Sequence, residues 1–332
     1  MTGDVVSGEI LVVLEHDRGE TSDTSFQAFG LARALLAAGV GSSITAVVIG
    51  AEADALAGGL GAYGAARSIS VHHGELTDYA PEAWGDVVAQ LIAARAPAAV
   101  VATGTDRGNE VLAHASAIVD LPFAANVTDV ALADGLSLTR VRWGGSLLEQ
   151  ARLQAPVFVL SGSAHTFSGE VSGDAAVVVE VLEPTLGASA ARTRVVDRVT
   201  LAAGITLTTA AVVVSGGRGV GSADGFAPLA ELAELLGGAV GCSRVVTNNG
   251  WRPHSDQVGQ TGKRIAPELY IACGISGAIQ HWVGMMASKH VLAINTDNEA
   301  NMVGKAEYAV IGDLHKILPA VSDEIRRRRA NA

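Results

Sequence analysis

The sequence has few cysteines and few aromatic residues. Two cysteines among 332 residues cannot form a disulfide framework, and Cys242 and Cys273 both lie in apolar segments where we expect small buried side chains. Aromatic residues make up 4% of the chain against 49% hydrophobic residues, so Ala, Val and Leu must build the core. This balance is typical of α/β proteins. No apolar stretch is long enough to span a bilayer, so we expect no direct membrane insertion.

Positive charge is also scarce. The chain carries 23 Lys and Arg against 34 Asp and Glu, a formal net charge of −11, which argues against nucleic-acid binding as its main task. Residues 1–4 lack the basic region and apolar run of a secretory signal, and we expect a cytoplasmic, bacterial protein. The nine histidines show no metal-ligand spacing, so no metal site is predicted.

The first part of the chain alternates strands and helices. Short apolar runs predict buried strands, and apolar residues at helical spacing predict helices over residues 25–36 and around residues 84–92. This alternation predicts a mostly parallel, doubly wound sheet. Past Asn126, strands follow one another without long helices. The predicted strands cover residues 10–14, 44–49, 98–102, 127–132, 136–143, 157–161 and 175–182.

The second part repeats the α/β pattern. Residues 183–206 hold Pro, Gly and many small or polar residues, which indicates a linker, and we predict domains over residues 1–198 and 199–332. A last helix is expected to follow Asp313. The other predicted elements of this domain are strands at residues 210–215, 239–243, 269–273, 291–294 and 308–311 and a helix at residues 228–236.

Several glycine-containing turns follow strands, but none is a nucleotide fingerprint. Thr103–Gly108 is interpreted as a strand-to-helix connection capped by Asp106, in preference to an anion site. In Ser215–Gly221 the third glycine falls one residue early for dinucleotide binding. In Gly259–Lys263 the glycines are too close for a P-loop, and Arg264 stands where a Ser or Thr would reach Mg²⁺.

The most informative stretch is Gln257–His281, which contains a loop, a short apolar strand and a second loop with Gly and Ser. Ala278–His281 is expected to open a helix that continues past His281. Backbone N–H groups at the start of a helix have no partner within the helix and can bind an anion. Two such loops close together predict a site for a large, phosphate-bearing cofactor.

This stretch resembles the signature of the electron transfer flavoprotein alpha subunit. Residues 215–219, 241–244, 293–295 and 312–314 extend the resemblance, in the order of that family. The N-terminal half resembles the family only in its general pattern. The resemblance implies a C-terminal FAD-binding domain of the NAD/FAD-binding type found in deoxyhypusine synthase, and an N-terminal domain that packs on a partner subunit.

The resemblance also assigns residues to the flavin. Arg244 matches an arginine over the isoalloxazine ring, Thr261 a hydroxyl near its N5 atom, and His281 a group at its N1/C2-carbonyl edge. A donor or cation at that edge would favour the negatively charged, one-electron-reduced ring, and burial would strengthen the effect. The remaining matched FAD contacts are Arg218, Ser243, Val258, Gly259, Gln260, Ser276, Gly277, Ala278, Ile279, Gln280, Asn295 and Asp313.

Without the resemblance, the same residues have simpler interpretations. Arg244 would be a surface cation, Asn295 a strand-end turn residue and Asp313 a helix N-cap. The chain also departs from the family pattern at residues 296–302, and at residues 248–254, where Arg252 and His254 are added. If Arg252 lies close to the flavin, its charge would raise the reduction potential, which we treat as a hypothesis.

We therefore expect a redox carrier without an organic substrate of its own. FAD would take electrons from flavin dehydrogenases of the acyl-CoA type and pass them singly to a quinone reductase of the respiratory chain. A beta subunit would complete the heterodimer and typically carry AMP. One alternative is an electron-bifurcating complex that uses NADH and holds a second FAD in the beta subunit. Another class, an NAD-dependent transferase or deacylase, shares the C-terminal fold.

Overall fold

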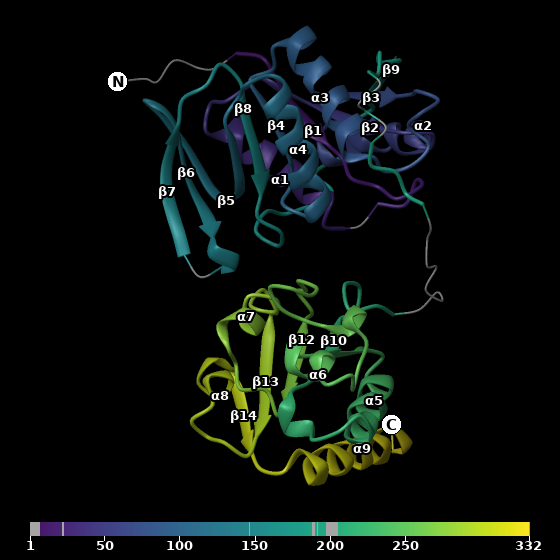
Figure 1. Cartoon of the computed structure of the whole chain (residues 1–332), viewed down its shortest axis with the longest axis vertical. Helices are drawn as coiled ribbons and strands as arrows, with labels where there is room; N and C mark the ends of the chain where they lie inside the picture. Colours follow the sequence, from purple (N-terminus) through teal and green to yellow (C-terminus); the bar gives the residue numbers. More distant parts are fainter. Residues whose placement is uncertain are drawn as a thin grey trace. The chain divides into compact units, whose positions relative to one another are not determined.

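A computed structural model describes residues 7–331 of the chain apart from residues 22, 146, 188–189, 191 and 197–204. The chain divides into two compact units, residues 1–199 and 200–332 (Figure 1). The boundary predicted between residues 198 and 199 lies outside the described residues.

The N-terminal unit is built on a nine-stranded sheet with the order β7-β6-β5-β8-β4-β1-β2-β3-β9. The strands from β5 through β8 to β9 pair in parallel, whereas β5-β6 and β6-β7 are antiparallel. The strands are β1 (Glu9–Val13), β2 (Ser43–Ile49), β3 (Arg67–Val71), β4 (Ala99–Thr103), β5 (Phe123–Ala133), β6 (Gly135–Arg142), β7 (Leu147–Leu153), β8 (Phe158–Gly162) and β9 (Val178–Leu182).

Both faces of this sheet are covered by helices, as the sequence pattern predicts. In β1, Ile10 and Val12 pack into one apolar cluster with α1, and Leu11 and Val13 into a second cluster with α3 and α4, because successive side chains of a strand point to opposite faces. The helices are α1 (Gln27–Ala37), α2 (Ala53–Ala57), α3 (Pro81–Arg95), α4 (Asp106–Ile118) and the 3-10 helices η1 (Leu60–Tyr63) and η2 (Trp143–Gly145).

The predicted cap of α4 is wrong by one residue. Thr105, not Asp106, is the N-cap, because its backbone is extended and its hydroxyl accepts a hydrogen bond from the N–H of Gly108 at 2.9 Å. Asp106 is instead the first residue of the helix, where a negative charge complements the helix dipole.

The C-terminal unit contains a five-stranded, fully parallel sheet with the order β11-β10-β12-β13-β14. Helices α5 and α9 pack together on the face that buries Val214 and Ile271, while Tyr270 and Ala293 are buried on the opposite face with Met302 of α8. The strands are β10 (Val212–Gly216), β11 (Ala239–Cys242), β12 (Leu269–Cys273), β13 (His290–Asn295) and β14 (Tyr308–Ile311).

The helices of this unit differ in length. Only α5 and α9 exceed two turns, and Asp313 caps α9 as predicted, accepting a hydrogen bond from the N–H of His315 at 2.9 Å. The helices are α5 (Ala227–Leu235), α6 (Arg244–Asn248), α7 (Ile279–Trp282), α8 (Asn301–Lys305) and α9 (Leu314–Ala330), with 3-10 helices η3 (Arg218–Val220), η4 (Asp224–Phe226) and η5 (His254–Asp256).

The prediction of a helix that continues well past His281 is wrong. Helix α7 is a single turn that ends at Trp282. The carbonyl of Gly284 accepts a hydrogen bond from the N–H of Ile265, and a Cβ at Gly284 would come within 2.3 Å of the Gly259 nitrogen. The helix ends where the Gln280 carbonyl accepts from the N–H of Gln260 at 2.7 Å and the N–H of Gly284 donates to the His281 carbonyl at 3.0 Å instead.

The described residues form neither a membrane-spanning helix nor a metal-binding cluster. None of the helices formed by these residues is both long enough and apolar enough to cross a membrane. The same part of the chain contains no group of three or more His, Cys, Asp or Glu side chains placed to hold a metal ion.

Candidate functional site

The strand order of the C-terminal sheet marks a binding position. The chain passes from β10 outward to β11 and then returns to the other side of β10 with β12, so the loops that follow β10 and β12 leave the sheet in opposite directions. In open parallel sheets, ligands bind at such a switch point, beyond the carboxyl ends of the strands. The loops concerned are residues 217–221 and 274–278.

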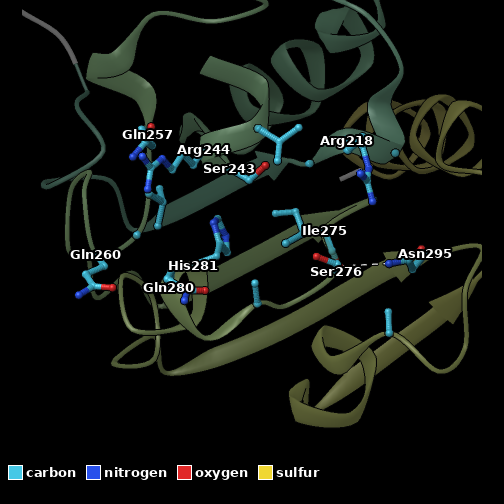
Figure 2. A pocket seen from close by; sticks show the side chains of 18 of the residues that line it. Arg218, Ser243, Arg244, Gln257, Gln260, Ile275, Ser276, Gln280, His281 and Asn295 are labelled. Atoms are coloured by element: carbon cyan, nitrogen blue, oxygen red, sulfur yellow. Dashed lines mark hydrogen bonds between the residues drawn. The ribbon is translucent and has the colours of Figure 1, made fainter. Parts of the chain in front are cut away.

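A cavity of about 530 Å³ opens at this position (Figure 2). Its walls come from the loops after β10, β11, β12 and β13, and from the loop at residues 257–261. The lining residues are Gly217, Arg218, Gly219, Ser243, Arg244, Val245, Gln257, Val258, Gly259, Gln260, Thr261, Gly274, Ile275, Ser276, Ala278, Gln280, His281, Asn295, Asp297 and Ala300. A volume in this range suits an organic cofactor rather than a single ion.

Close backbone contact holds the two switch-point loops together. The N–H of Gly217 donates to the Cys273 carbonyl at 2.9 Å, and that of Gly219 to the Gly274 carbonyl at 3.0 Å. A Cβ on Gly217 would lie 2.3 Å from the Gly274 oxygen, so no larger residue fits there. The glycines therefore let the loops approach each other and keep the floor of the cavity free of side chains.

Two arginines supply the positive charge of the cavity. Figure 2 shows Arg244 on the same side as Gln257, and Arg218 at the opposite end beyond Ile275. Both side chains are exposed, and no ion pair to either is found among the described residues. Asp297 is the one acidic residue of the lining, so the cavity favours an anionic ligand with charge at two separated positions.

His281 forms part of the cavity wall from the start of α7. Its side chain is buried at 6% exposure, and Nε2 lies 2.8 Å from the Tyr270 hydroxyl. Burial lowers the pKa of His281 to about 4, and a weak interaction with the Val258 backbone opposes this only in part. The imidazole is therefore neutral near pH 7 in this chain and can donate one hydrogen bond.

Asn295 stands at the carboxyl end of β13, where its amide ties two walls together. Its Nδ2 donates to the Ile275 carbonyl at 3.1 Å, the bond drawn in Figure 2. The Oδ1 atom accepts from the N–H of Asp297 at 3.1 Å. The side chain thus acts as the predicted strand-end turn residue and still lines the cavity.

Most predicted cofactor residues meet in this cavity. The twelve that line it are Arg218, Ser243, Arg244, Val258, Gly259, Gln260, Thr261, Ser276, Ala278, Gln280, His281 and Asn295. Three others lie apart from the lining: Gly277 packs against the Met302 nitrogen, Ile279 is 40% exposed, and Asp313 caps α9. Contact of any of the fifteen residues with FAD stays a prediction.

Sequence reasoning missed Gln257 among the lining residues. Gln257 is the first residue of the signature stretch, and a glutamine before a glycine loop carries no local signal of burial. The structure buries it to 3% exposure, and its amide bonds to Thr247 and Thr261. A buried glutamine between two threonines is visible only once the loop at residues 257–261 lies against α6.

Comparison with known sequences agrees with the geometry. Residues 206–286 match the electron transfer flavoprotein FAD-binding domain, and residues 10–204 match the electron transfer flavoprotein domain. The chain is 37% identical over 329 residues to the electron transfer flavoprotein subunit alpha of Mycobacterium leprae, covering 97% of this chain and 99% of that one.

Two further relatives show the same extent of similarity. The electron transfer flavoprotein subunit alpha of Bacillus subtilis is 32% identical, with 96% of this chain and 98% of that one covered. Protein FixB of Clostridium saccharobutylicum is 33% identical, with 93% and 94% covered. The matches span both units, including the segment that forms the cavity. The chain belongs to the electron transfer flavoprotein alpha-subunit family.

Proposed function

We propose that the cavity binds FAD and that this chain is the alpha subunit of a heterodimeric electron transfer flavoprotein. The observation that carries the proposal is the cavity at the switch point, lined by Arg218 and Arg244 without ion pairs among the described residues. Two separated cations suit a cofactor that has a pyrophosphate and a ring able to accept negative charge. FAD supplies the capacity to take up and release electrons one at a time.

The two ends of the cavity suit the two ends of FAD. Arg218, Ser276 and Asn295 line the cavity on the side of Figure 2 away from Arg244 and would hold the pyrophosphate and adenosine side. Arg244, Thr261 and His281 would surround the ring, with Arg244 as the cation and Thr261 and His281 as neutral donors. Because the site is partly closed, these groups act at a lower effective dielectric than in water.

The partners follow from the family. A beta subunit would complete the flavin site and carry AMP, the electron donors would be flavin dehydrogenases of the acyl-CoA type, and the acceptor a quinone oxidoreductase. In the bifurcating alternative the beta subunit carries a second FAD and NADH is the donor. Counting flavins in the purified heterodimer separates these two: one FAD supports the simple carrier, and two support bifurcation.

Co-expression with a beta subunit tests the FAD site directly. The purified pair should be yellow, with FAD at a fixed ratio to the alpha chain. Replacing both cavity arginines (Arg218→Ala with Arg244→Ala) should weaken FAD binding by 100-fold or more, if each charge–phosphate or charge–ring contact contributes about 1.5–3 kcal/mol. Arg252→Ala is the matched control, because Arg252 lies outside the lining. A colourless pair, or one that binds NAD instead, would overturn the proposal.

A further inference from the structure

A short chain of polar side chains runs behind one wall of the cavity. The single hydroxyl hydrogen of Thr247 in α6 has two acceptors within reach, Gln257 Oε1 at 2.7 Å and the Arg244 carbonyl at 2.9 Å, and Gln257 Nε2 donates to the Thr261 hydroxyl oxygen at 2.9 Å. Gln257 is 3% exposed, whereas Thr261 is exposed and lines the cavity. A buried amide thus connects a helix residue to a hydroxyl at the ligand surface.

The backbone holds Gln257 in place. Its carbonyl accepts from the N–H of Lys263 at 2.7 Å, and the next N–H, of Val258, donates to the Cys242 carbonyl at 2.9 Å. A Cβ on Gly262 would come within 2.3 Å of the Gln257 oxygen, so the loop packs closely over this residue. The amide therefore has little freedom to move away from Thr261.

The direction of these hydrogen bonds determines whether the Thr261 hydroxyl can donate a hydrogen bond to a ligand in the cavity. A hydroxyl has one hydrogen and can both donate and accept. Since Gln257 Nε2 donates to the Thr261 oxygen, the hydroxyl hydrogen is left for an acceptor in the cavity. If the amide were reversed, Thr261 would donate to Gln257 and would present only an acceptor to the ligand.

We propose that Gln257 is a positioning residue that fixes the Thr261 hydroxyl as a hydrogen-bond donor to the ligand. The inference rests on the proposed function: with FAD bound, the acceptor would be ring nitrogen N5. Bound FAD would supply one-electron chemistry: on full reduction an electron from the reductant and a proton from water would turn N5 from a hydrogen-bond acceptor into a donor. A hydroxyl held as a donor opposes that change, so Gln257 lowers the second one-electron potential.

The test replaces Gln257 in the purified heterodimer and measures both one-electron potentials by stepwise reduction with dithionite. Gln257→Met has a similar length but cannot donate to Thr261, so the hydroxyl can rotate and accept from N–H. The equilibrium constant of the second step should rise about tenfold, which is 59 mV for one electron. Gln257→Leu, which likewise cannot donate to Thr261 and adds no charge beside the ring, should change the second potential in the same direction.

A double substitution shows whether Gln257 acts through Thr261. In a Thr261→Val background, Gln257→Met should no longer shift the second potential. An unchanged potential in Gln257→Met, or a shift that persists in Thr261→Val, would overturn the inference while the FAD site stands. If Gln257→Met does not fold, the direction of the Gln257→Leu shift decides. A wild-type pair without FAD would instead contradict the proposed function itself.

Discussion

The Tyr270 hydroxyl lies 2.8 Å from Nε2 of His281, and both side chains are buried. Burial raises the pKa of the Tyr270 phenol, so it keeps its proton and can donate to Nε2. With Nε2 as the acceptor, the imidazole proton lies on Nδ1, which is buried with no hydrogen-bond partner among the described residues. A core residue of β12 thereby sets the state of a histidine in the cavity wall.

Tyr270→Phe removes the partner of a buried imidazole and should destabilise the protein. Because Nε2 is left without a hydrogen bond, the free energy of unfolding should fall by about 1–3 kcal/mol. Urea denaturation of the wild type and the variant measures the difference. Tyr308→Phe is the matched control, since Tyr308 is 62% exposed in β14 and its loss should cost less than about 0.5 kcal/mol. Equal effects of the two substitutions would contradict the hydrogen bond.

His281 predicts a specific pH dependence of stability. Burial depresses its pKa from 6.5 to about 4, so as the pH falls below 6.5 the unfolded chain takes up a proton that the folded chain does not. Stability is therefore fully present above pH 6.5 and is lost as the pH falls towards 4, by about 3 kcal/mol in total.

The measurement compares FAD-free wild type with His281→Gln, which keeps an oxygen able to accept from Tyr270 but does not titrate. The difference in unfolding free energy between the two should change between pH 7 and pH 4.5, with the wild type losing more. The titration of all other groups is shared and cancels. A difference that is constant over this range would show that His281 is accessible to protons in the folded chain.

The sequence predicted helices and strands well where a single continuous segment forms a single element. Apolar runs such as residues 269–273 and 308–311 form β12 and β14 with the predicted bounds, and most residues assigned from the family resemblance line one cavity. Strand β7 was not predicted, because its sequence mixes Leu with Glu, Gln and Arg, as an exposed antiparallel strand does. The relationship between Tyr270 and His281 depends on packing between elements, which no local pattern contains.

Arg252 illustrates the same limit for charge. Its Nη2 lies 2.6 Å from an Asp256 oxygen, its guanidinium lies 5.7 Å from the Phe226 ring centre, and it does not line the cavity. Because the neighbouring carboxylate offsets its charge and Arg252 lies outside the lining, we predict that it does not raise the flavin potential. Arg252→Ala should leave the potential of bound FAD unchanged. Arg244→Ala should lower the first one-electron potential by at least 59 mV, which is a tenfold decrease in the equilibrium constant of that step. A shift in Arg252→Ala as large as in Arg244→Ala would contradict this prediction.

The capping residue of α9 gives a prediction about stability alone. The Asp313 carboxylate accepts from the N–H of His315, one of the backbone groups that a helix start leaves without a partner. Asp313→Ala should lower the free energy of unfolding by about 0.5–2 kcal/mol, and Asp313→Asn, which can still cap, by less. FAD affinity decides whether Asp313 also contacts the cofactor, as the family resemblance implies. Weaker FAD binding in Asp313→Asn, at unchanged stability, would support that contact.

The contact between the switch-point loops should tolerate no side chain at Gly217. Gly217→Ala would place a methyl group 2.3 Å from the Gly274 oxygen and 2.8 Å from the Ile275 Cα, both backbone atoms. The loops must then separate, which breaks the hydrogen bonds of Gly217 and Gly219 and should cost about 2–4 kcal/mol together with most FAD binding.

Gly304 in α8 provides the control for this steric argument. A Cβ there meets nothing within 4 Å, and Ala is favoured over Gly inside a helix, so Gly304→Ala should stabilise the protein by up to about 1 kcal/mol. Urea denaturation and FAD titration of both variants measure the contrast. The loss of stability at Gly217 would come from the neighbouring backbone, whereas the gain at Gly304 would come from the helix preference of Ala over Gly. If Gly217→Ala bound FAD as well as Gly304→Ala, the close approach of the two loops would not be what shapes the cavity.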